Sequence, residues 1–226
     1  MAQYVGIAAE VARTLGGGRV LDWGAGWGQT SLLLRAHGLD VVAYDVEDKG
    51  TAAGLLAGSD VAYVVTPGPA LPFPAGAFDA VLNCGVLEHV ADERAALAEL
   101  ARVLRPDGWL FTYHLPNRHA WAEWLGRRLG RFHHARTYTR REAVGLFEAA
   151  GFRVVVCRPF HWLPRNVWGR SAPLAALAPV AAGGFELLDR GLLHVPGVRR
   201  LATAWALVAR REAARTDVSG AGSPHP

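Results

Sequence analysis

Short apolar runs alternate with amphipathic segments along the chain as far as about residue 160. The runs have the length and composition of buried strands, and the segments between them repeat apolar residues with helical spacing. We predict strands at 19–24, 40–46, 61–65, 78–83, 109–115 and 152–160, and helices at 3–15, 28–37, 91–104 and 139–151. This alternation is typical of an α/β fold in which crossover helices join the strands of a mostly parallel sheet.

Residues at the ends of these segments support the boundaries. Gly38 stops the second helix, and the turn at 106–108 separates the third helix from the strand that follows. Thr139 is a suitable N-cap for the last of these helices, which ends on Gly151.

The pattern loosens after residue 160, where four prolines interrupt it: Pro164, Pro173, Pro179 and Pro196. A last buried strand is predicted at 201–211, and the tail from residue 212 to 226 is expected to be disordered. We therefore expect a single domain over 1–211, with lid or cap segments at about 116–137 and 161–200.

Composition and cysteine content restrict the class of protein. Of the 226 residues, 51% are hydrophobic and 19% are charged, which suits a globular domain. Cys84 and Cys157 fit no metal-ligand spacing and are too few for a disulfide framework. The first fifteen residues lack the pattern of a signal peptide, and two prolines, two glycines and Glu186 make 172–188 a poor membrane-spanning helix. We expect a cytoplasmic protein.

Charge divides the chain into two halves. Residues 1–117 carry a balance of −6, whereas residues 118–226 carry a balance of +10. A basic half could meet nucleic acid, an anionic membrane surface or an acidic small molecule. Alternatively, the 23 arginines and single lysine reflect a compositional bias.

The segment VLDWGAGWGQTS (20–31) carries the most specific chemistry. Three glycines, Gly24, Gly26 and Gly28, follow a strand and precede a helix, so the backbone can approach a ligand closely. No Gly-Lys-Ser/Thr follows, and Gln29 stands where the dinucleotide pattern needs its last glycine. Asp45 closes the next strand, where its carboxylate can accept both hydroxyls of a ribose. A nucleoside fits this loop, although three glycines alone can also form a mere tight turn.

The whole run resembles the class I S-adenosylmethionine-dependent methyltransferases, in particular those that methylate small molecules. The matching pieces occur in the family's order over roughly 15–160: VLDWGAGWGQ, the acid of AYDV, LPFPAGAFDAVLNCGVLEHV, RVLRPDGWL and YTRREAVGLFEAAGF. The resemblance implies a Rossmann-like, mostly parallel seven-stranded sheet with helices on both faces. The family's last strand is antiparallel, which would account for the isolated strand at 201–211.

The resemblance also implies the residues that hold the cofactor, S-adenosyl-L-methionine. Its methionine part would lie against Asp22, Gly24, Gly26, Gly28 and Asn83. Its ribose would be held by Asp45, and its adenine would pack on Val46. Pro67 stands where many relatives have an adenine-binding Asp, so adenine contact would fall to backbone near Gly68 or to packing. Trp23 and Trp27 either narrow this pocket or pack the loop, and we favour packing because aromatic residues usually bury.

Histidines near the same sheet edge are candidates for acceptor chemistry. His89 follows the fourth strand and His114 ends the fifth, so either could act as general base for a hydroxyl acceptor. His133 and His134 lie in the lid, where one of them would contact the substrate. The alternative for each is a hydrogen-bonded or solvated histidine, and without nearby acids or cysteines the pair is no metal site.

The lid segment has the composition of an acceptor-binding surface. Trp121 and Trp124 recur at helical spacing beside Arg127 and Arg128, which would suit an anionic or aromatic acceptor. Alternatively, the aromatics simply cover the sheet.

We expect a methyltransferase that acts on a small molecule at oxygen, whether a metabolite, a glycan or a lipid-linked precursor. One alternative is a nucleic-acid methyltransferase, which the sequence disfavours because NCGV stands where an NPPY-like catalytic tetrapeptide would be. Another is a non-catalytic partner subunit.

Peripheral membrane contact through 172–188 is a further hypothesis, since Arg165, Arg170, Arg199 and Arg200 flank it. A helical cap on the domain is the interpretation we favour. The chain could be a monomer or a homodimer.

Overall fold

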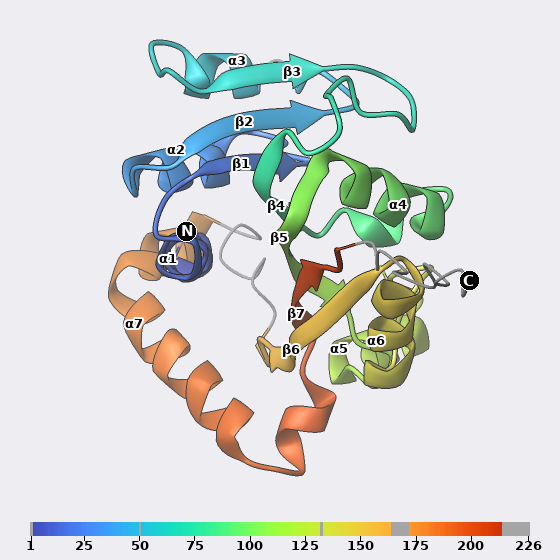
Figure 1. The fold of residues 1–226 in the computed structure, drawn as a ribbon. Coiled ribbons are helices and arrows are strands. Elements are labelled where there is room, and N and C mark those ends of the chain that lie inside the picture. The colour runs from blue at the N-terminus through green and yellow to red at the C-terminus, as the bar shows by residue number, and fades with distance from the viewer. Residues whose placement is uncertain (1, 50, 132, 164–171, 214–226) are drawn as a thin grey trace, which may run out of the picture.

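The computed structural model describes residues 2–49, 51–131, 133–163 and 172–213. Seven strands form one sheet in the order β3-β2-β1-β4-β5-β7-β6 (Figure 1). The strands are β1 (Arg19–Trp23), β2 (Asp40–Asp45), β3 (Ala62–Val65), β4 (Phe78–Cys84), β5 (Leu104–Pro116), β6 (Phe152–Phe160) and β7 (Ala204–Arg211). All pairings are parallel except the two made by β7, which confirms the predicted Rossmann-like sheet with an antiparallel last strand.

Helices cover both faces of the sheet. They are α1 (Ala2–Leu15), α2 (Gln29–Ala36), α3 (Thr51–Leu56), α4 (Glu93–Val103), α5 (Trp121–Arg128), α6 (Arg140–Ala149) and α7 (Ala172–His194). The described residues also include two short 3-10 helices, η1 (Leu87–His89) after β4 and η3 (Val198–Leu201) after α7. Sequence analysis did not predict α3.

The sheet has a hydrophobic core on each face, because successive side chains of a strand point to opposite faces. Leu21 of β1 packs in the core that α4 and α6 cover, and its neighbour Val20 packs in the core that α1 and α2 cover. Figure 1 shows these helix pairs on opposite sides of the sheet.

Capping residues set the starts of two helices. Asp92 accepts hydrogen bonds from the backbone of Arg94 and Ala95, so α4 begins at Glu93, two residues later than predicted. Thr139 caps α6 as predicted, and it forms a capping box with Glu142.

The turn predicted at 106–108 lies inside a strand. β5 begins at Leu104, and its pairing with β4 shifts register between Phe78 and Ala80. Asp107 has a φ of 60° within this irregular stretch. The Pro-Asp-Gly signal therefore marks an interruption of the ladder rather than the start of the strand.

Ala172–His194 form the long helix α7, which corrects the prediction that prolines break this segment. Pro173 lies in the first turn of α7, where a missing N–H costs nothing. Pro179 lies inside the helix, which continues past it and past Gly183 and Gly184. β7 in turn begins at Ala204 rather than 201, because η3 occupies the preceding residues.

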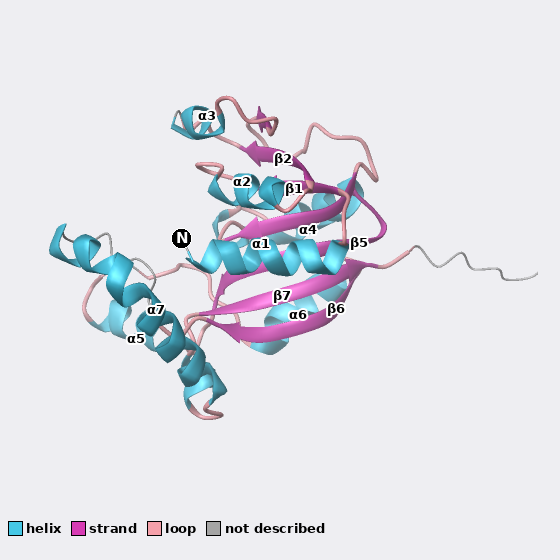
Figure 2. Ribbon diagram, turned by 90° about the vertical axis from the view of Figure 1, so that its left-hand side faces the viewer, coloured by secondary structure: helices cyan, strands magenta, loops and turns pink. Residues whose placement is uncertain are grey.

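A buried carboxylate ties α7 to the end of β6. Asp189 is 1% exposed, and its Oδ1 accepts hydrogen bonds from the backbone N–H groups of Trp162 and Leu163 at 2.8 and 2.7 Å. The ring of Trp162 stacks on Trp121 of α5, whose Nε1 donates to the Trp162 carbonyl at 2.8 Å. Figure 2 shows that α5 and α7 each lie beyond the end of the sheet at which the parallel strands finish. These contacts build the helical cap that the sequence analysis favoured.

Among the helices that the structure describes, none is long and apolar enough to cross a membrane. Pro164, Arg165, Arg170 and residues 214–226 of the predicted tail lie outside the described residues.

Candidate functional site

The loop after β1 holds three glycines in the left-handed region. Gly24, Gly26 and Gly28 have φ values of 75°, 53° and 74°, which L side chains rarely adopt. A Cβ on Gly24 would lie 2.3 Å from Cγ2 of Val86, and one on Gly28 would lie 2.7 Å from Cγ of Leu56. A Cβ on Gly26 would meet nothing within 4 Å. The loop is therefore packed at its two ends and open at its centre.

Asp45, the last residue of β2, fixes this loop. Its Oδ2 accepts a hydrogen bond from the N–H of Gly26 at 2.8 Å, and its Oδ1 accepts one from the next backbone N–H at 2.8 Å. The carbonyl of Tyr44 accepts the N–H groups of Gly24 and Ala25 at 2.8 and 2.9 Å. Oδ1 also accepts a longer hydrogen bond from the N–H of Glu47 at 3.4 Å, so the remaining acceptor capacity lies on Oδ2, whose second lone pair can accept a ligand hydroxyl.

Asp22 lies buried in β1 without a cationic partner among the described residues. Its Oδ2 accepts a hydrogen bond from Oγ of Ser31 at 2.6 Å. Burial raises the pKa of Asp22 to about 6, against the Ser31 hydrogen bond, which lowers it, and with a further rise from the charge of Asp45. A cation placed beside this carboxyl would favour its ionised form.

Asn83 lies opposite Trp23, at the carboxyl end of β4, and is fully buried. Its Nδ2 is 3.5 Å from Oγ1 of Thr112, and its Oδ1 has no hydrogen-bond partner within the described part of the chain. Because buried polar atoms are normally paired, this oxygen is a candidate ligand contact.

The two loop tryptophans differ in environment. Trp23 is 8% exposed and packs in the core beneath α4 and α6, as the packing interpretation predicted. Trp27 is 55% exposed, so the same interpretation is wrong for Trp27. Val46 is 48% exposed beyond β2, and Gly68, with a φ of 114°, is exposed with open space at its Cβ position.

The sequence and the fold both match known methyltransferases. Residues 21–112 match the family model described as a methyltransferase domain. The chain is 34% identical over 193 residues to the demethylmenaquinone methyltransferase of Thermus thermophilus, an alignment that covers 78% of this chain and 81% of that protein. It is 30% identical over 204 residues to a ubiquinone biosynthesis O-methyltransferase of Rhizobium etli, covering 87% of this chain and 70% of the relative. The chain belongs to the class I S-adenosylmethionine-dependent methyltransferases.

Solved structures share the fold of this methyltransferase. The 1,6-didemethyltoxoflavin-N1-methyltransferase of Burkholderia thailandensis superposes with a TM-score of 0.62 at 22% identity, covering 93% of this chain and 79% of that one. The [4+2]-cyclase SpnF has a TM-score of 0.64 at 22% identity, covering 92% and 80%. A fold that also serves a cyclase does not fix the reaction, so these two likenesses are evidence for the fold alone.

The methyltransferase uses S-adenosylmethionine on a small-molecule acceptor, and the alternatives of a non-catalytic subunit and of a nucleic-acid methyltransferase are set aside. The site suits this donor: the centre of the glycine loop is open, Asp22 has no cationic partner among the described residues, and Asn83 presents an unpaired oxygen. When bound, the donor supplies a methyl group already activated on a sulfonium, which leaves the protein chiefly to position the acceptor and exclude water.

His114 lies among aromatic rings at the end of β5. Its φ is 63°, and the pairing of β5 with β7 shifts register between Thr112 and Leu115. Its ring is 5.1 Å from that of Phe160 and 5.5 Å from that of His161, on which it stacks. An irregularity of this kind re-aims a side chain at the edge of a sheet, where α/β proteins bind ligands.

A second group joins His89 to the lid. His134 Nδ1 lies 2.5 Å from Oε1 of Glu123, and the backbone N–H of His134 donates to Oε2 at 3.0 Å. The rings of His89 and His134 are 6.2 Å apart, and Nε2 of His89 is 3.8 Å from Oε1 of Glu88. Burial raises the pKa of Glu88, and the charges of His89 and His134 oppose that rise. We call these four residues the His–Glu cluster.

The other predicted acceptor residues do not all converge. Trp121 stacks within the cap, whereas Trp124 is 59% exposed, with the guanidinium of Arg128 5.5 Å from its ring centre. Arg127 and Arg128 are exposed and pair with no carboxylate in the described ranges. His133 is also exposed, with Nδ1 3.2 Å from a backbone carbonyl.

Sequence reasoning missed several residues of the site: Ser31, Glu88, Glu123, Trp162 and Asp189. Glu88 stands directly beside His89, and Glu123 directly precedes Trp124 in the lid, so both were within reach of a search for acids near histidines. Asp189 and Trp162 come together only through the placement of α7, which no local pattern reveals.

Replacing Asp22 by Asn should stabilise the protein above pH 6. A pKa raised from 3.8 to about 6 corresponds to about 3 kcal/mol. Because the folded-state pKa is above the unfolded value, the protonated form favours folding below about pH 4, and this contribution is lost as pH rises through 6. Urea unfolding of both proteins at about pH 4 and about pH 8 measures the difference. If Asp22→Asn were less stable than wild type at about pH 8, ionised Asp22 would not destabilise the fold, which would contradict its raised pKa.

Proposed function

We propose that this methyltransferase methylates a hydroxyl oxygen on an aromatic small molecule of the quinone-precursor class. Support comes from the relatives, which are named for demethylmenaquinone methylation and for O-methylation in ubiquinone biosynthesis. The cap adds support, because the Trp121–Trp162 stack and the exposed Trp124 offer aromatic surface next to the carboxyl edge of the sheet. Arg127 and Arg128 would meet an anionic substituent.

The donor is proposed to bind through the residues of the glycine loop and its neighbours. Asp22 would meet the ammonium, and Asp45, already fixed by backbone donors, would accept the ribose hydroxyls. Asn83 would use its unpaired Oδ1 on the methionine side. The exposed Val46 and Gly68 would contact the adenine, and Trp27 would border the same pocket.

His134 is proposed as the general base, with Glu123 as its positioning partner. The single observation that carries this assignment is the contact between Nδ1 of His134 and the carboxylate of Glu123, which is 7% exposed. A carboxylate at Nδ1 favours the tautomer with its proton there, which leaves the Nε2 lone pair to take the proton of the acceptor hydroxyl. The general-base role of His89, which lies beside His134, and of His114 stays a prediction, and His114 also stays a predicted acceptor contact.

The acceptor proposal is tested by incubating the protein with radiolabelled S-adenosylmethionine and two probes. One is a prenylated catechol, which offers oxygen, and the other is a demethylnaphthoquinol, which also offers a ring carbon. We expect label in a methyl ether of the catechol. Methylation of the ring carbon alone, or of neither probe by protein that binds the donor, would contradict the proposal.

The base is tested with His134→Ala and Glu123→Gln, with His133→Ala as the matched control. Loss of a general base should lower kcat on an unactivated catechol by about 100-fold or more, while KM changes little. The loss should shrink for a nitrocatechol, whose hydroxyl ionises without help. If His134 had only a structural role, His134→Ala would lower kcat on the catechol and on the nitrocatechol by the same factor. This equal loss would overturn the assignment even if the acceptor proposal holds.

Membrane contact is a second proposal, which rests on α7. Next to its anchoring residue Asp189 in the sequence, α7 exposes Leu187 by 73% and Leu188 by 56%. Arg199 and Arg200 are exposed on the following 3-10 helix. An apolar surface beside cations suits the interface of an anionic bilayer. Such contact would bring a lipid-linked acceptor to the cap.

Co-sedimentation with phosphatidylglycerol vesicles at low salt measures this contact. Wild type should pellet, and Leu187→Ser/Leu188→Ser should lose most of the pelleted fraction. The control is Val155→Ser, which removes an apolar side chain of 46% exposure from β6. Equal pelleting of all three proteins, or none of wild type, would rule out contact through α7.

A further inference from the structure

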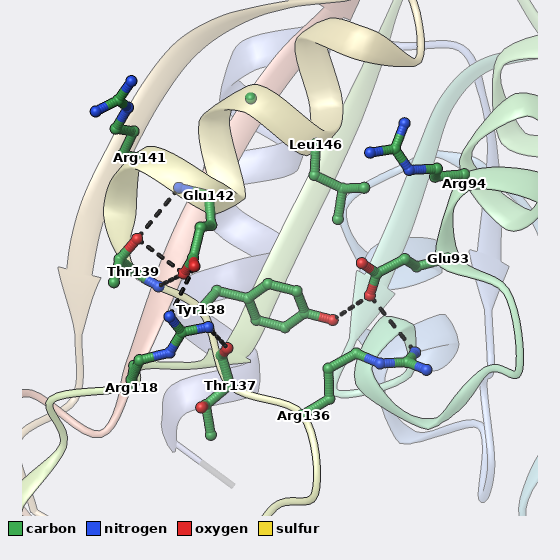
Figure 3. A pocket seen from close by; sticks show the side chains of 11 residues that line it. Glu93, Arg94, Arg118, Arg136, Thr137, Tyr138, Thr139, Arg141, Glu142 and Leu146 are labelled. Carbon is green, nitrogen blue, oxygen red and sulfur yellow. Dashed lines mark hydrogen bonds and ion pairs between the residues drawn. The ribbon is translucent and has the colours of Figure 1, made fainter.

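A basic groove lies apart from the donor loop, on the side of the sheet that α4 and α6 cover. Its volume is about 710 Å³, within the range of small-molecule sites. Four arginines line it: Arg94, Arg118, Arg136 and Arg141. Figure 3 shows their guanidinium groups spread around its perimeter, with the ring of Tyr138 between them. We call it the arginine groove.

The carboxylates of the groove are already engaged. Glu142 pairs with Arg118 at 2.7 Å through Oε1, and its Oε2 accepts from the Thr139 backbone at 2.8 Å. Glu93 accepts a hydrogen bond from the Tyr138 hydroxyl at 2.7 Å and lies 3.5 Å from Arg136. These contacts hold the floor of the groove in one arrangement, in which Glu142 uses both of its oxygens and Glu93 uses Oε2 for both of its contacts.

The other two cations have no such partners. Within the described ranges, neither Arg94 nor Arg141 makes a side-chain hydrogen bond or ion pair, and both are exposed. Figure 3 shows them on opposite sides of the groove, one from α4 and one from α6. With four arginines against two glutamates, the lining keeps an excess of two positive charges. The four guanidinium groups that carry this excess are spread around the rim of the groove.

We propose that the arginine groove binds a small molecule through a phosphate or diphosphate group. Guanidinium groups match phosphate oxygens with paired hydrogen bonds, and the lining contains arginine as its only cation type. An excess of two positive charges matches the charge of such a group. The site shares no lining residue with the glycine loop or the His–Glu cluster, so it is a second site and not part of the donor pocket.

One contact connects the groove to the proposed acceptor side. Arg136 donates from its guanidinium to the carbonyl of Val90 at 2.7 Å, directly after His89. A phosphate that draws Arg136 into the groove would act on this segment. A ligand in the groove would thereby change the contacts of Val90, the residue next to His89.

Isothermal titration of the whole chain with inorganic diphosphate tests the groove. The double variant Arg94→Ala/Arg141→Ala should bind diphosphate at least tenfold more weakly than wild type, and added salt should weaken wild-type binding. Both side chains are exposed and unpaired, so the variant should keep the circular dichroism of wild type. The control is Arg153→Ala, which removes an exposed arginine at the start of β6 and should leave binding unchanged.

A second arm distinguishes the source of the phosphate. Flotation with vesicles of phosphatidylcholine, with and without phosphatidic acid, reports binding to a lipid headgroup, and titration with diphosphate reports binding to a soluble one. A loss confined to Arg94→Ala/Arg141→Ala in either arm supports the site and names its source. Failure of wild type in both arms, or equal binding by the double variant, would overturn it.

Discussion

The carboxylate of Asp45 is the contact on which the site depends. It joins the end of β2 to the centre of the loop that leaves β1, through the N–H of Gly26 at 2.8 Å. The loop reaches this carboxylate only because Gly24 and Gly28 take left-handed φ values where no side chain fits. Parallel pairing of β1 with β2 brings the two strand ends level, so the sheet, the loop and the acid form one unit.

Asp22 is a buried acid on β1, the strand that leads into this loop. Asp22 costs folding free energy when it ionises, since burial raises its pKa to about 6. Proteins keep such unfavourable groups where a ligand repays the cost. Asp22 has no cationic partner among the described residues, and Oδ1 of Asn83 has no hydrogen-bond partner there, so these are the two groups that the proposed donor would satisfy.

Sequence alone predicted most of the fold and the position of the glycine loop between β1 and α2, because both depend on local signals. The strand pattern, the N-cap at Thr139 and the position of Asp45 at the end of a strand can each be recognised from a short segment of the sequence. Prediction failed in two places. α7 runs through Pro179, and Asp189 near its end is anchored to the residues after β6, a contact that no local pattern reveals. The turn signal at Asp107 lies in an irregular stretch of β5. Around the proposed acceptor site, the sequence singled out His89 and His134. The acids that contact them, Glu88 and Glu123, were found only in the structure.

The most direct measurement of this account is calorimetric binding of S-adenosylhomocysteine and of NAD to wild type and to Asp45→Ala. We expect wild type to bind S-adenosylhomocysteine and not NAD, because Gln29 replaces the glycine that a dinucleotide needs. We also expect Asp45→Ala to bind S-adenosylhomocysteine at least tenfold more weakly. Wild-type affinity in a folded Asp45→Ala variant, or no binding by wild type, would contradict the central role of this loop and its carboxylate.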